Sequence, residues 1–94
     1  MVVINGKQCS IEFYRQLAPV TFFQRGRQVT QNRMSTTAVL VGEQGEVMDV
    51  ATVKPYHKDA YNRKKANEAA VHKLAEQFEP TVKVQILRGF FNKP

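Results

Sequence analysis

Cysteine, acidic residues and long apolar runs are scarce in this chain of 94 residues, and tryptophan is missing. A single cysteine, Cys9, excludes an internal disulfide framework and a zinc site built from cysteines, so we expect a cytoplasmic protein. No apolar stretch approaches the roughly 18 residues that a membrane-spanning helix needs, so we expect no membrane partner. The first residues also lack the basic start and the long apolar stretch of a secretory signal peptide.

The residue patterns that support catalysis or metal binding are missing as well. The two histidines have no partner at a zinc-ligand spacing, and no phosphate-binding glycine loop or nucleophile elbow occurs. Cys9 falls on the inward side of an alternating segment, where it is interpreted as a small buried apolar residue. The carboxylates of Glu43, Glu46 and Asp49 surround one turn, where they are solvated. We therefore expect no enzyme, no catalytic residue, no metal and no cofactor.

What the chain contains is an ordinary globular balance with a surplus of positive charge. Hydrophobic residues make up 43% and charged residues 23%, which suits one domain over residues 1–94. Fourteen Lys and Arg stand against eight Asp and Glu, for a formal net charge of +6. The cations concentrate in residues 1–33 and 54–73, and residues 34–53 carry acidic charges alone. This distribution favours polyanions or acidic protein surfaces; alternatively, the cations only keep a small domain soluble.

Turn and alternation patterns predict hairpins in the first part of the chain. Asn5-Gly6 between apolar segments is a strong hairpin signal. Residues 34–41 and 46–54 read as two strands around a glycine turn. Residues 20–33, with Arg25-Gly26-Arg27 near their centre, are either a second hairpin with a basic tip or a mobile loop. The sequence leaves both alternatives open.

The last third predicts one long helix from about residue 58 to 78. Val71, Leu74 and Phe78 fall on one apolar stripe, and Pro80 is expected to end the helix. Alternation over residues 82–87 then predicts a C-terminal strand. The predicted fold class is α+β, an antiparallel β-sheet with one long α-helix packed on one face and a C-terminal strand. The tail at Phe90-Phe91 is either a sheet edge or a sticky end, which would allow a homodimer, although nothing sets the oligomeric state.

Basic residues at the expected helix start form the leading candidate site. A helix N-terminus attracts anions through its free N–H groups, and a cluster of cations there suits phosphates. Two arginines on a glycine turn also suit phosphate contacts. The predicted nucleic-acid-binding residues are Lys54, Lys58, Arg63, Lys64, Lys65, Arg25 and Arg27.

The segment from Val53 to Leu74 (VKPYHKDAYNRKKANEAAVHKL) resembles the strand–helix end of many small bacteriophage-encoded proteins. These show the pattern V-K-x-H-P-x-D-x-F-N-R before a helix rich in Ala and Leu. In this chain Tyr61 replaces the Phe, and Tyr56-His57 stands in place of the His-Pro pair. The resemblance covers about a quarter of the chain. It implies a phage accessory protein, such as an anti-defence factor, acting in the host cytoplasm.

The run from Lys64 to Ala70 (KKANEAA) is similar to the KKxAK element that begins the last helix of double-stranded RNA-binding domains. Glu68 stands near the place of that element's final lysine, and residues 1–14 read as strands where that family has a helix. The similarity implies that Lys64 and Lys65 contact phosphates across a groove.

These observations lead to two hypotheses about function. The first is a small non-enzymatic basic protein that binds nucleic acid or a nucleoprotein through a Lys/Arg face. The alternative is a phage-encoded inhibitor, of an anti-defence or anti-CRISPR type, that docks on a host protein or nuclease complex.

Overall fold

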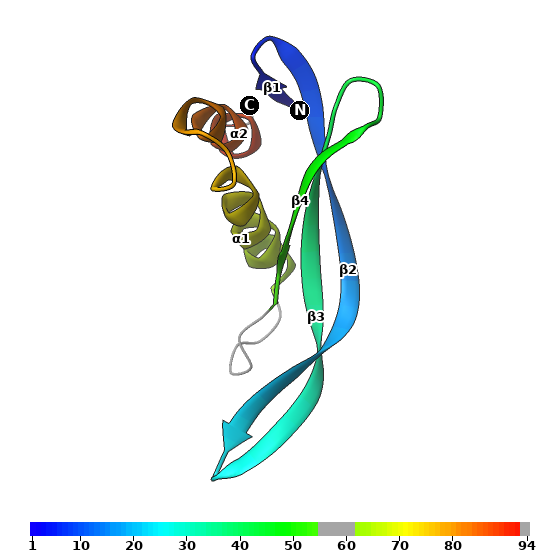
Figure 1. Cartoon of the computed structure of the whole chain (residues 1–94), viewed down its shortest axis with the longest axis vertical. Helices are drawn as coiled ribbons and strands as arrows, with labels where there is room; N and C mark the ends of the chain where they lie inside the picture. The colour runs from blue at the N-terminus through cyan, green and yellow to red at the C-terminus, as the bar shows by residue number, and fades with distance from the viewer. Residues whose placement is uncertain (55–61, 93–94) are drawn as a thin grey trace.

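The computed structural model describes residues 1–54 and 62–92, whose strands form one antiparallel sheet in chain order. The sheet is covered on one face by the two helices that follow it (Figure 1). The predicted α+β class with an antiparallel sheet is therefore confirmed. The elements are β1 (Val2–Ile4), β2 (Lys7–Gln24), β3 (Arg27–Val41), β4 (Val47–Val53), α1 (Arg63–Ala75) and α2 (Pro80–Phe91).

Two tight turns set the register of the first three strands. The predicted hairpin at Asn5-Gly6 joins β1 to β2. At the second turn Arg25 has φ 52° and Gly26 has φ 76°. Two successive positive φ angles are typical of a type I′ turn, whose twist matches that of the flanking strands. Residues 20–33 are therefore a hairpin with a basic tip, the first of the two alternatives left open by the sequence.

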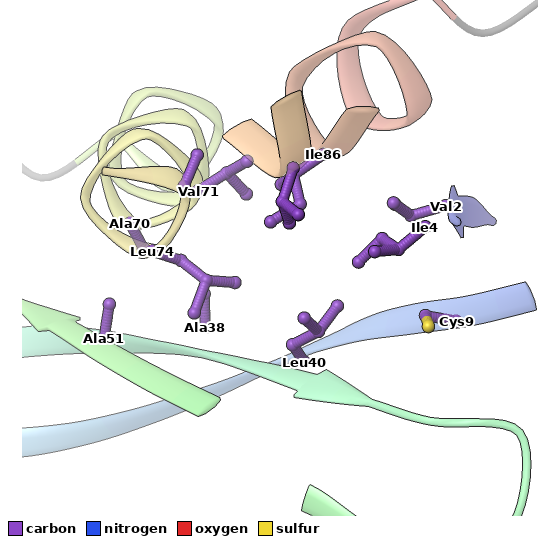
Figure 2. Packing of buried hydrophobic residues seen from close by; sticks show 12 residues of the cluster. Val2, Ile4, Cys9, Ala38, Leu40, Ala51, Ala70, Val71, Leu74 and Ile86 are labelled. Carbon is purple, nitrogen blue, oxygen red and sulfur yellow. The ribbon is translucent and has the colours of Figure 1, made fainter. Parts of the chain in front are cut away.

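The core lies between the sheet and the two helices. Leu40 of β3, Leu74 of α1 and Ile86 of α2 are fully buried and point toward the same interior (Figure 2). Val71 and Leu74 confirm the predicted apolar stripe, and Phe78 packs at its edge. Cys9 is buried in the same cluster, as its place in the alternating segment predicts. Burial of these side chains is the main force that holds the helices on the sheet.

The helical region differs from the predicted single helix. Helix α1 begins at Arg63 and ends at Ala75, and the predicted start at residues 58–61 lies outside the described residues. After Ala75 the amide N of Phe78 donates to the Ala75 carbonyl, which tightens the chain into a turn. Pro80 was expected to end a helix, but it begins one. It is the first residue of α2, where its fixed φ is favourable and its missing N–H is not needed.

The predicted C-terminal strand at residues 82–87 is wrong, because these residues belong to α2. Val82 and Ile86 are one helical turn apart and both are buried, whereas Val84 is 47% exposed. A strand would have placed all three on one face. The sheet-edge alternative for the tail is also wrong, because Phe90 lies in the last turn of α2 and packs edge-on to Phe13, with ring centroids 5.8 Å apart. Phe91 is 41% exposed, and the sticky-end alternative stays a prediction.

Half of the β2–β3 hairpin projects beyond the rest of the molecule (Figure 1). Strand β4 pairs with β3 only as far as Thr36, so past this residue the described chain has two paired strands and no third. We call residues 16–24 of β2 with 27–35 of β3 the ribbon. At about 3.3 Å per residue each arm spans about 30 Å. The ribbon accounts for much of the 52 Å length of the molecule.

Candidate basic interface

Part of the predicted basic cluster occupies the start of α1. The side-chain Oδ1 of the N-cap residue Asn62 accepts a hydrogen bond from the Lys65 amide N at 3.1 Å. Arg63, Lys64 and Lys65 follow with exposed side chains, and the first turn contains no acidic residue. The helix dipole makes cations unfavourable at this end. An anion at this end would be attracted both by the helix dipole and by the three cations. The hydrogen bond of the Asn62 cap offsets part of the repulsion between the cations and the dipole.

Lys54 lies at the end of the helix–sheet layer where α1 begins. It directly follows the last residue of β4 and is exposed. Helix α1 packs against β3 and β4, and Figure 1 shows that it begins at the level where β4 ends. We call Lys54, Arg63, Lys64 and Lys65 the α1 cluster. The predicted Lys58 lies outside the described residues.

Arg25 and Arg27 are not part of the α1 cluster. Both are exposed at the turn of the ribbon, at the far end of the molecule (Figure 1). Arg15 in β2 marks the level of α1, because its guanidinium donates a hydrogen bond to the side-chain oxygen of Asn67. Ten residues of extended strand separate Arg15 from Arg25, which corresponds to about 33 Å. The structure thus divides the predicted site residues between two separate places.

The ribbon and the adjacent Arg15 carry more positive charge than the site prediction included. Between Phe13 and Gly42 the chain contains no Asp or Glu, and its only charged residues are arginines. Arg15 and Arg33 were absent from the predicted site, and both are half-buried. The lack of acidic residues over this long segment was the available signal, and it becomes informative once the segment is known to form one hairpin.

Acidic residues gather at the opposite end of the sheet. Glu43 and Glu46 are exposed in the turn between β3 and β4, which Figure 1 places at the other end of the long axis from the ribbon turn. The Glu43 carboxylate accepts a hydrogen bond from the Gln8 amide N at 3.0 Å. Burial raises the pKa of the Cys9 thiol, and the two carboxylates raise it further. A thiol with a raised pKa is a poor nucleophile at neutral pH, in keeping with the structural role predicted for Cys9.

Among residues 1–54 and 62–92, no three side chains of the metal-ligating types His, Cys, Asp and Glu come together. Of the two histidines, His72 is exposed and stacks on Phe91, with ring centroids 5.1 Å apart. His57 lies outside the described residues. The predicted site residues that the structure describes thus present positive charge at two exposed places, the α1 cluster and the turn of the ribbon.

Neither described helix is long and apolar enough to cross a membrane. A comparison with protein-family models finds no match to this chain, and searches of curated proteins and of solved structures also find none.

Proposed function

We propose that this chain is a small non-enzymatic protein that binds nucleic acid or a nucleoprotein, acting in the cytoplasm. The supporting observation is the separation of charge along the long axis. The ribbon with its turn and the first turn of α1 contain no acidic side chain among their described residues, and Glu68 is the first carboxylate along α1. We call these segments, with the neighbouring Arg15 and Lys54, the basic half, and its cations are Arg15, Arg25, Arg27, Arg33, Lys54, Arg63, Lys64 and Lys65.

Such a half attracts a polyanion in a defined orientation. Within the described residues, the exposed α1 cluster has no carboxylate as a neighbour in its first helical turn. Phosphates can therefore replace solvent at these cations without first breaking ion pairs within that turn. Contacts of this kind supply affinity with little sequence preference, and they release counterions, so binding weakens steeply as salt rises.

The test is a titration followed by fluorescence anisotropy. Labelled duplex DNA, duplex RNA and single strands are titrated with the protein at several salt concentrations. The variant Lys64→Ala with Lys65→Ala removes two cations of the α1 cluster. The matched control, Lys83→Ala with Arg88→Ala, removes the same charge from α2, at the other end of the helical layer. We expect the first pair to reduce the slope of log K against log salt by about 2 and the second pair to change it much less.

Two outcomes would reject the proposal. One is the absence of binding to any of the nucleic acids at low salt. The other is binding that both variants weaken equally, because this would show a general effect of net charge and no dedicated basic half. Circular dichroism of each variant establishes that the fold is retained.

A second candidate function is the inhibitor that docks on a host protein or a nuclease complex. It is favoured by the sheet face turned away from the helices, where Tyr14, Val47 and Val50 are 56%, 64% and 46% exposed. Exposed apolar side chains on neighbouring strands are typical of protein interaction sites. A nuclease inhibited equally by the wild type and by Val50→Asp would argue against docking through this face.

A further inference from the structure

We propose that the ribbon enters the major groove of duplex DNA and contacts base edges through Gln28, Thr30 and Asn32. This inference rests on the proposed function and specifies its ligand. It starts from the pairing register, which determines the side chains that share each face of the ribbon. Thr21 pairs with Thr30, and their hydroxyl oxygens lie 3.1 Å apart, so both side chains lie on the same face.

One face of the ribbon carries a row of uncharged polar side chains. Successive side chains of a strand alternate between faces, so Gln28, Thr30 and Asn32 share the face marked by Thr21. All three are exposed. Phe23, which pairs with Gln28, and Leu17 lie on the same face and are 76% and 60% exposed. We call this the reading face.

The chemistry of the reading face fits the major groove. Asn and Gln can form paired hydrogen bonds with adenine, Thr can bond to several base edges, and apolar side chains contact the thymine methyl group. A carboxylate would repel the phosphates on either side of the groove, and the ribbon has none. Arg25 and Arg27 at the turn add the planar guanidinium groups that suit phosphates and guanine edges.

The dimensions also agree with this ligand. The major groove of B-form DNA is about 12 Å wide and admits a two-stranded ribbon, whereas the major groove of A-form RNA is too narrow. Each arm of the ribbon spans about 30 Å, which exceeds the groove depth of about 8.5 Å. Thr36 is the last β3 residue paired with β4, so neither β4 nor any other described strand widens the ribbon.

The β2 edge of the ribbon favours such a ligand over a further strand that another protein would add at this edge. The type I′ turn makes Gln24 and Arg27 a hydrogen-bonded pair, so even-numbered residues of β2 bond to β3 and odd-numbered ones face the open edge. Pro19 therefore has its missing N–H on the open edge, near the middle of the β2 arm. A proline there interrupts any ladder that an added strand would need.

The experiment compares two duplexes of the same sequence, about 30 base pairs long. In one duplex every cytosine carries a glucosylated hydroxymethyl group at C5, which fills the major groove and leaves phosphates and the minor groove unchanged. We expect the wild type to bind the blocked duplex at least about tenfold more weakly, the loss of about one base-edge pair. The Lys64→Ala, Lys65→Ala variant should bind both duplexes more weakly and keep this ratio.

Two triple variants distinguish the faces of the ribbon. Gln28→Ala, Thr30→Val and Asn32→Ala together remove the polar groups of the reading face, and the ratio between the duplexes should fall toward one. Gln16→Ala, Gln24→Ala and Gln31→Ala remove three exposed side chains from the opposite face and should leave the ratio unchanged.

The inference and the proposed function fail in different ways. Equal binding of the wild type to both duplexes would overturn the major-groove inference and leave phosphate-based binding intact. Loss of the ratio in the opposite-face variant alone would overturn the assignment of the reading face. Failure of the wild type to bind any nucleic acid would reject the proposed function itself.

Discussion

At the scale of the residue, Leu74 is one of the fully buried side chains that form the helix–sheet contact. It is fully buried and points from α1 toward β3 (Figure 2). Leu74→Ala should lower the free energy of unfolding by about 2 to 5 kcal/mol, since it removes apolar contacts and leaves a cavity. Urea denaturation followed by circular dichroism measures this change. Val84→Ala, at an exposed position of α2, is the control and should stay within about 0.5 kcal/mol of the wild type. Equal effects at both positions would contradict the burial pattern.

The thiol of Cys9 should make the free energy of unfolding depend on pH in the alkaline range. Because burial, Glu43 and Glu46 raise the pKa of its thiol, the folded state keeps this proton at a pH where the unfolded chain has lost it. The free energy of unfolding should therefore fall as pH rises above the ordinary thiol pKa of about 8.5 toward the higher folded value. Denaturation curves across this range measure the slope, and Cys9→Ala should flatten it. The pKa of Tyr14 is also raised, by its hydrogen bond to Glu12, so its contribution should remain in the variant. An unchanged slope in Cys9→Ala would exclude the thiol as the cause.

At the scale of the element, the two helices begin with caps of different quality. Asn62 makes a side-chain cap on α1, whereas Glu79 at the same position of α2 makes none. Asn62→Ala should therefore cost about 0.5 to 2 kcal/mol. Glu79→Asp should stabilise the protein by about 0.5 to 1 kcal/mol, because the shorter carboxylate can accept from the free N–H groups. Thermal unfolding of both variants measures the difference, and a destabilised Glu79→Asp protein would contradict the cap geometry.

The elements also show where a local sequence pattern is sufficient to predict the secondary structure. The hairpin at Asn5-Gly6 and the apolar stripe with Val71 and Leu74 depend on neighbouring residues, and both are confirmed. Residues 82–87 fit a strand and a helix equally well, because their apolar side chains satisfy both periods over so short a span. The contact of α2 with β1 decides between them. A Cβ at Gly89 would lie 2.9 Å from the Val2 Cα, so the glycine permits the helix to approach this strand.

At the scale of the whole molecule, stability is distributed unevenly along the long axis. The buried residues cluster between the helices and the part of the sheet nearer β1, whereas few ribbon side chains are buried. Amides of residues 16–33 should therefore exchange with deuterium more than about tenfold faster than those of residues 36–41, because local opening breaks fewer apolar contacts. Mass spectrometry of peptic peptides measures both regions in one sample. Equal protection would mean that the ribbon is stabilised by contacts other than its own pairing.

The candidate site could be predicted in its residue types but not in its arrangement. The basic surplus and the run Arg63–Lys65 can be read directly from the sequence, and so can the arginine pair at Gly26. Their separation by roughly 30 Å follows from the length of the β2–β3 pairing, which a local pattern does not determine. Arg33 of the ribbon and Arg15 next to it add to the positive charge that the sequence shows, but only the hairpin places them on a surface.

By itself, the sequence determined the turn at Asn5-Gly6 and the glycine turn after residue 41, the inward position of Cys9, the apolar face of α1 and the positive charge, because each depends on residues close together in the chain. Only the tertiary structure decided that residues 80–91 form a helix and that the basic residues occupy two places. It also decided that Gln28, Thr30 and Asn32 share an exposed face. These features depend on which distant segments pack together, and that choice is made by burial and strand pairing across the whole chain.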